Sequence, residues 1–256
     1  MVRPVGARDR VVVLGGLMAV TALAWAYLLY MGWGMEHMEA GADMAIMPRM
    51  TDWKAIDLLL VFAMWVIMMA AMMLPSAAPM LLVFAALNRA RRAQRGPFAP
   101  TGIFALGYLA AWTVFSLLAT LAQWGLLEAR LVTPMMESAS PLLGGALLIA
   151  AGVFQFTPLK RTCLAGCSSP LTFVMTEWRE GTRGAFIMGL RHGAYCIGCC
   201  WLLMALLFVF GVMNLLWIAF LAIFVLVEKL LPGARWLSSA GAVLLIAWGL
   251  LVAGGY

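Results

Sequence analysis

The strongest constraint on this chain is a series of long apolar segments that contain few charged residues. These segments cover residues 11–31, 55–74, 101–125, 141–157, 185–210, 213–230 and 236–254. Apolar residues make up 65% of the chain and charged residues 11%, whereas soluble domains have about 45–50% and about 25%. A membrane-spanning helix needs about 20 apolar residues, so we predict an all-α, polytopic transmembrane helix bundle with about seven spans. The bundle is expected to form one integral membrane domain over residues 1–256.

The distribution of basic residues predicts the orientation of this bundle. If the N-terminus is inside, the cytoplasmic side holds all 17 lysine and arginine residues except Arg49, Lys54 and Arg130. Basic residues accumulate on the cytoplasmic side of membrane proteins, so an N-in, C-out topology is expected. Because the basic residues lie in short clusters at the segment ends, the net charge of +6 indicates a topology signal and no nucleic-acid partner.

The apolar stretch from Ala55 to Asn88 is too long for one span and short for two. Pro75 and Pro79 interrupt it, and proline ends or kinks a helix. A second crossing would put the Arg89–Arg95 cluster on the side opposite the other basic clusters. We therefore expect residues 76–88 to form a kinked extension near the cytoplasmic face.

The fifth segment carries the most informative set of side chains. At 100° per residue, its soft donors fall on one helical stripe about 80° wide, with Cys200 at its border. The stripe comprises Met188, His192, Cys196 and Cys199. Thiolates and thioethers select Cu(I), and imidazole suits several transition metals. The alternative is that cysteine fills the apolar interior and that the small residues Gly189 and Gly193 pack this helix against a neighbour.

A second pair of thiols, Cys163 and Cys167, lies in a predicted cytoplasmic segment. If the segment is helical, residues i and i+4 face the same way. Cytoplasmic thiols stay reduced, which favours a metal-binding pair over a structural disulfide. A reversible disulfide and a purely structural loop remain the alternatives.

Methionines supply further candidate ligands. In the second segment Asp57, Met64 and Met68 share a stripe, with Met72 beside them. His37 lies among the methionines of a predicted outer loop, which are Met31, Met35, Met38, Met44, Met47 and Met50. The alternatives are adaptable core packing for the former group and an interfacial loop for the latter. Arg191 and Glu228 are predicted to form a structural ion pair between neighbouring helices.

Four motifs resemble a bacterial family of predicted metal-binding integral membrane proteins. They are the methionine-rich run at 68–80, Cys163-x3-Cys167, the segment 189–201 and the Glu228-Lys-x2-Pro232 motif. The resemblance covers residues 55 to 235. Some relatives in this family are described as copper chaperones that serve copper oxidases. The resemblance implies copper handling in a bacterial inner membrane, with a copper-dependent enzyme or a soluble metallochaperone as partner.

The primary hypothesis is thus a membrane protein that binds Cu(I) for delivery to, or maturation of, a copper enzyme, without catalysis of its own. The first alternative is a membrane redox enzyme that uses its thiols or a bound metal. The second is a structural subunit, as an oligomer or within a larger membrane complex, whose glycine faces at Gly144, Gly145 and Gly249 mainly pack helices.

Overall fold

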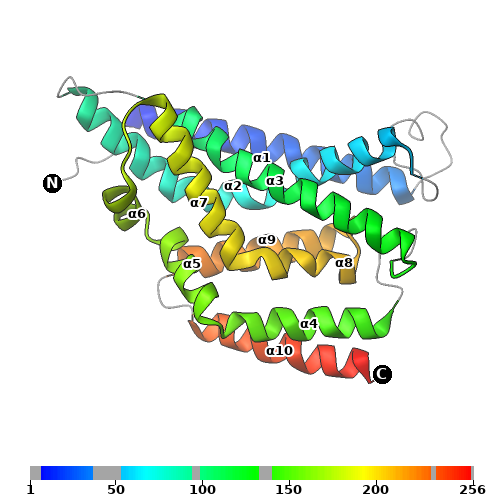
Figure 1. Ribbon diagram of the computed structural model, residues 1–256. Coiled ribbons are helices and arrows are strands. Elements are labelled where there is room, and N and C mark those ends of the chain that lie inside the picture. Colours follow the sequence, from blue (N-terminus) through cyan, green and yellow to red (C-terminus); the bar gives the residue numbers. More distant parts are fainter. Residues whose placement is uncertain (1–6, 37–52, 94–98, 133–139, 232–234, 255–256) are drawn as a thin grey trace.

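The computed structural model describes residues 7–36, 53–93, 99–132, 140–231 and 235–254. These ranges contain helices and no β-strand, which confirms the predicted all-α class. In chain order (Figure 1), the helices are α1 (Ala7–Glu36), α2 (Ala55–Ala93), α3 (Thr101–Glu128), α4 (Pro141–Gln155), α5 (Pro158–Ser168), α6 (Pro170–Glu177), α7 (Gly181–Ala205), α8 (Leu207–Phe210), α9 (Leu215–Leu230) and α10 (Arg235–Ala253).

Five helical stretches are long and apolar enough to cross a membrane. They are Arg10–Gly34, Ala55–Arg91, Thr101–Glu128, Gly181–Phe210 and Trp236–Ala253. The other two predicted segments also form helices, but α4 has 15 residues and α9 has 16. Helix α4 is followed by α5 at an angle of 65°, and the two together would make a sixth span if they form one broken crossing. The count of seven spans and the orientation therefore stay predictions.

Helix α2 continues through both of its prolines as a single helix of 39 residues. Side-chain hydroxyl groups donate hydrogen bonds to the backbone of the turn before these prolines. Ser76 Oγ and Tyr108 Oη both donate to the Met73 carbonyl oxygen, at 2.8 and 3.1 Å. The region from 76 to 88 thus extends α2, as expected, and does not return as a separate helix.

Glycines allow two helix pairs to approach each other closely. A Cβ atom on Gly107 or Gly189 would clash with backbone carbonyls of the facing helix, which joins α3 to α7. A Cβ on Gly145 would lie 2.7 Å from the Gly249 carbonyl oxygen, which joins α4 to α10. The packing role considered for these small residues is therefore real, and it operates within one chain.

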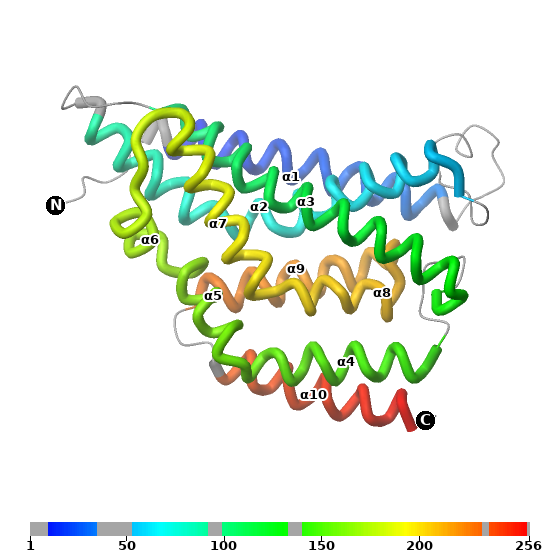
Figure 2. The backbone as a smooth tube through the Cα atoms, in the orientation of Figure 1, coloured from blue at the N-terminus to red at the C-terminus, as the bar shows by residue number. Residues whose placement is uncertain are grey.

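The helices form layers that run along a common direction. Figure 1 shows α1, α2 and α3 at one side, α7 and α9 in the middle, and α4 with α10 at the other side. Figure 2 shows how the chain leaves α4, turns into α5 and α6, and then enters α7. This turn places α5 against α7, the helix that carries the predicted stripe of donors.

Candidate metal centre

The predicted donor stripe of α7 faces the protein interior. Met188, His192, Cys196, Cys199 and Cys200 each have at most 1% of their surface exposed. Cys199 Sγ and Cys200 Sγ both donate to the Cys196 carbonyl oxygen, at 3.1 and 3.0 Å. The thiols therefore lie within about one helical turn of one another, away from the outer surface of the bundle.

Helix α5 brings a fourth buried thiol to this place. Its start is encoded locally, because Thr157 Oγ1 accepts a hydrogen bond from the Lys160 backbone N–H at 3.3 Å and Pro158 occupies the first helical turn. Cys167 is buried and its side chain lies close to those of Cys196 and Cys199. We call Cys167, Cys196, Cys199 and Cys200 the thiol cluster.

Cys163 lies on the same side of α5 as Cys167 but is only half-buried. A Cβ atom on Gly198 of α7 would lie 2.7 Å from Cys163 Sγ. The absence of a side chain at this glycine thus makes room for the thiol. The segment with Cys163 and Cys167 is helical, which meets the condition for the two thiols to face the same way. Cys163 lies at the edge of the thiol cluster, closer to the surface.

Lys229 of α9 points into the thiol cluster. Its Nζ atom lies 2.9 Å from Cys196 Sγ, 3.1 Å from Ser76 Oγ and 4.0 Å from Met73 Sδ. Only 7% of this lysine is exposed, and a buried charge is costly unless opposite charge or hydrogen bonds compensate it. Lys229 was not among the site residues predicted from the sequence. The signal was available, since an ionisable residue within an apolar helix needs a local reason.

Tyr108 of α3 is a second neighbour that was not predicted. Its hydroxyl group lies 3.0 Å from Cys196 Sγ and donates to the Met73 carbonyl oxygen. It connects α3, α2 and α7 at the cluster. A single tyrosine in an apolar helix gives no sequence signal for such a role.

His192 lies beside the thiol cluster in an aromatic enclosure. Its ring centroid is 6.0 Å from that of Phe104, 5.7 Å from that of Tyr108 and 5.4 Å from that of Phe173. The Nδ1 atom is buried and has no hydrogen-bond partner among the described residues. A neutral imidazole has one nitrogen that accepts a proton or binds a metal. An unpartnered, buried ring nitrogen suits a metal ligand.

The predicted methionine ligands are dispersed. Met64, Met68 and Met72 are buried in the core that joins α2 to its neighbours. Met188 Sδ accepts a hydrogen bond from the Arg179 backbone N–H at 3.3 Å. Met73, which was not predicted as a ligand, contributes the methionine sulfur near Lys229. His37 and the loop residues Met38, Met44, Met47 and Met50 lie outside the described residues.

The predicted ion pair between Arg191 and Glu228 is replaced by two others. Arg191 lies on the exposed side of α7 and pairs with Glu177. Glu228 points toward α5, where both of its carboxylate oxygens accept hydrogen bonds from Lys160 Nζ at 2.6 and 2.8 Å. The prediction is wrong because the two side chains project from different sides of their helices and each has a nearer partner.

The donor set fits a soft monovalent ion. Thiolate sulfur selects Cu(I), and imidazole is a compatible additional ligand. Within the described ranges, no three His, Cys, Asp or Glu side chains already surround a single point in the manner of an assembled metal site. Cys196 Sγ instead contacts Lys229 and Tyr108, and the thiols of Cys199 and Cys200 donate to the Cys196 carbonyl oxygen. Ion binding therefore requires these side chains to exchange their present hydrogen bonds for bonds to the metal.

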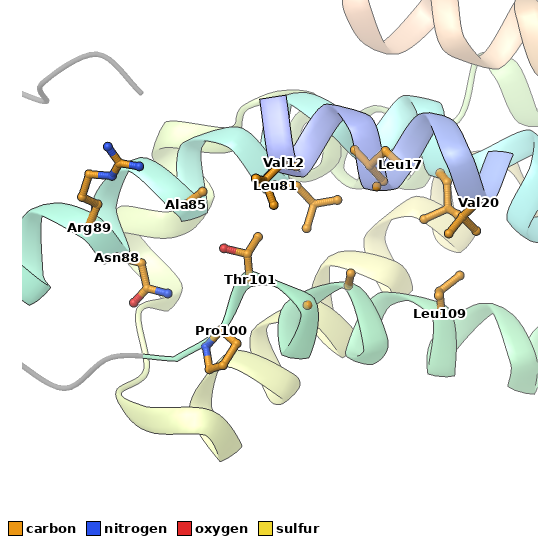
Figure 3. Close-up of a pocket in the computed structure, with 15 residues that line it drawn as sticks. Val12, Leu17, Val20, Leu81, Ala85, Asn88, Arg89, Pro100, Thr101 and Leu109 are labelled. Carbon is orange, nitrogen blue, oxygen red and sulfur yellow. The ribbon is translucent and has the colours of Figure 1, made fainter. Parts of the chain in front are cut away.

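An apolar pocket lies elsewhere in the molecule, away from the thiol cluster. It has a volume of about 980 Å³ and lies between α1, α2 and α3 (Figure 3). Its lining includes Leu17, Leu81 and Leu109, and the described residues that form it include no cysteine, histidine or methionine. The apolar pocket therefore lacks the donors that a transition metal needs.

Comparison with known protein families identifies a match over most of the chain. The profile of the PpoB2 family, described as a copper chaperone, matches residues 62–252. This range includes the thiol cluster, Cys163, Met188 and His192, whereas His37, Asp57 and the methionines of the predicted outer loop precede it. Neither the curated proteins nor the solved structures include a significant match.

Proposed function

The chain belongs to the PpoB2 family of copper chaperones, and on this premise we propose that it binds Cu(I) within a membrane and passes it to a copper-dependent enzyme. The observation that carries this proposal is the convergence of Cys167 with the three cysteines of α7 in the buried interior. Soft thiolates at a buried position favour Cu(I) over harder ions. Copper is the cargo here, so the protein needs no catalytic step of its own.

We propose that residues 1–256 form one integral membrane domain with seven crossings, in the inner membrane of a bacterium. The arrangement in Figure 1 supports this topology, because α1, α3, α7 and α10 begin at the end where the N-terminus lies, while α2, α4 and α9 run back toward it. In this reading α4 with α5 forms one broken crossing and α9 is a short one. The basic residues at that end support a cytoplasmic location for it, because such residues accumulate on the cytoplasmic side of membrane proteins.

The proposed ligands are the thiol cluster and His192. Two thiolates bound to Cu(I) form a unit with a charge of −1, and the ammonium group of Lys229 neutralises it. This pairing matters because an isolated charge in an apolar interior costs several kcal/mol. Lys229 at 2.9 Å from Cys196 Sγ is close enough to serve as that counter-charge without being a ligand.

The remaining candidates would act along the route of the ion. Cys163, at the edge of the cluster, would exchange copper with the cytoplasm. His37, together with Met64, Met68, Met72 and Met188, would contribute weaker donors between the outer face and the cluster.

The test is the copper content of the full-length protein, purified under anaerobic conditions in detergent after growth with copper. The Cys199→Ser/Cys200→Ser variant should lose most of the bound copper, whereas Met204→Leu, a buried change on the same helix, should retain it. Equal copper retention in both variants would refute the site. Thiol counting on the same samples separates a redox enzyme, which should show a disulfide that forms and reopens without metal.

A further inference from the structure

A second pocket lies at the end of the bundle where α4 turns into α5. It has a volume of about 490 Å³ and is bounded by α4, α5, the last turn of α9 and the first part of α10. In Figure 1 these segments meet at the same end of the molecule as the N-terminus. Hydroxyl groups of Ser168, Ser169, Ser238 and Ser239 contribute to its lining. The pocket thus has a mixed lining that is more polar than that of the apolar pocket beside α1.

The charged groups of this pocket leave an excess of positive charge. Lys160 and Glu228 are both buried and neutralise each other, with Ser238 Oγ donating to Glu228 at 2.6 Å. Among the described residues, the other charged members of the lining are Arg161 and Lys229, both basic. Arg161 is exposed at the surface, and one of its guanidinium nitrogens donates to the Phe156 carbonyl oxygen at 2.9 Å. A pocket with this balance attracts anions.

Lys229 connects the pocket with the thiol cluster. It belongs to the lining of the pocket, and its Nζ atom also lies 2.9 Å from Cys196 Sγ. Helix α5 forms the wall between the two regions. Leu164 and Ala165 face the pocket, whereas Cys163 and Cys167 face α7 on the other side of the helix. A copper complex held in the pocket would therefore be separated from the cluster by Lys229 and a single helix.

We propose that this pocket is the loading site for copper and that it binds Cu(I) as an anionic complex with a small thiol that carries carboxylates. This inference rests on the proposed copper-binding function. Arg161 and Lys229 would attract the carboxylates, and the serine hydroxyl groups and Gln155 would hydrogen-bond to them. A Cu(I) ion bound by two thiolates carries a charge of −1, so the positive charges of Arg161 and Lys229 also attract the metal centre of the complex.

The transfer is an exchange of ligands without oxidation or reduction. As Cu(I) passes from the pocket to the far side of α5, two cysteine thiols of the cluster replace the two small thiolates on it. Two copper–sulfur bonds break and two form, and each cysteine proton passes to a departing thiolate. The small thiol therefore leaves in its protonated form. The copper unit keeps its charge of −1 throughout, so Lys229 can neutralise it in either position.

The test compares two copper donors on the full-length protein in nanodiscs of zwitterionic lipid under anaerobic conditions. One donor is the Cu(I) complex of glutathione, which is anionic, and the other is the Cu(I) complex of acetonitrile, which is cationic. Arg161→Glu on α5 and Ser239→Asp on α10 each place a negative charge at an exposed position of the pocket lining. Arg183→Glu is the matched control, since this exposed arginine of α7 is not in that lining.

Both pocket variants should load copper from the glutathione complex about tenfold more slowly than the wild-type protein at low salt. They should load it from the acetonitrile complex at the wild-type rate or faster, and Arg183→Glu should match the wild-type protein with both donors. Equal rates in pocket variants and wild type with the glutathione complex would overturn the loading site, while copper binding itself would stand. Failure of the wild-type protein to bind copper from either donor would overturn the proposed function and this inference together.

Discussion

The buried ion pair between Lys160 and Glu228 offers a sharp test of how α5 is held in place. Both side chains are only 2% exposed, and Lys160 Nζ lies 2.6 and 2.8 Å from the two carboxylate oxygens. The Glu228→Gln change leaves the ammonium group of Lys160 without a counter-charge. Breaking a buried pair from one side costs about 3–5 kcal/mol. We expect a value of about 3 kcal/mol, since Gln155 still accepts a hydrogen bond from Lys160.

The assay is the free energy of unfolding in mixed detergent micelles, followed with a fluorogenic dye that reacts with the buried cysteines as they become exposed. The matched control is Glu177→Gln, which breaks the more exposed pair with Arg191 and should cost less than about 1 kcal/mol. The double variant Lys160→Met/Glu228→Leu removes both charges and should recover most of the lost stability. Equal stability of Glu228→Gln and wild type, or a double variant less stable than the single one, would refute this reasoning.

Three further predictions address packing, charge and exposure. Gly189→Ala should lower the free energy of unfolding by about 1–3 kcal/mol, because the added Cβ meets the backbone of α3. The control is Gly125→Ala, which should cause no loss because a Cβ there meets nothing within 4 Å. Equal effects of the two changes would contradict the close packing of α3 and α7. Lys229→Met should weaken Cu(I) binding by about a hundredfold in a competition assay with a chelator. Lys229→Arg should bind Cu(I) more tightly than Lys229→Met, because it keeps the positive charge beside the bound ion. Equal Cu(I) affinities of the two variants would exclude Lys229 as the counter-charge. In native protein, N-ethylmaleimide should label the half-buried Cys163 before the buried Cys199. Peptide mass spectrometry measures the two labelling rates, and equal rates would contradict the burial of the thiol cluster.

Much of the helical arrangement is predictable from the apolar segments. Each of the seven predicted segments contains a helix, because apolar side chains and internal backbone hydrogen bonds favour helices in these runs. The bend after Gln155 was not predicted, although Thr157 and Pro158 form a recognisable start for a new helix. Helices α4 and α9 are also each two residues shorter than the predicted segments: α4 ends at Gln155, and α9 begins at Leu215 because Asn214 caps it.

The candidate site was predictable only within single helices. Helical periodicity gave the inward stripe of His192 and the α7 cysteines, because residues on one helix have a fixed angular relation. The approach of Lys229 to Cys196 spans 33 residues and depends on how α9 packs against α7, which no local pattern encodes. The predicted partner of Glu228 was wrong for the same reason, namely that the pairing depends on helix packing. Several basic residues lie at the same end of the bundle, and only the packing of α5 selects Lys160.

X-ray absorption at the copper edge of anaerobically loaded, full-length protein tests the central claim most directly. We predict a Cu(I) edge and a first shell of sulfur in the wild-type protein, with sulfur scattering reduced or lost in Cys199→Ser/Cys200→Ser. A first shell of nitrogen and oxygen alone, or an identical sulfur shell in the variant, would contradict copper binding by the thiol cluster.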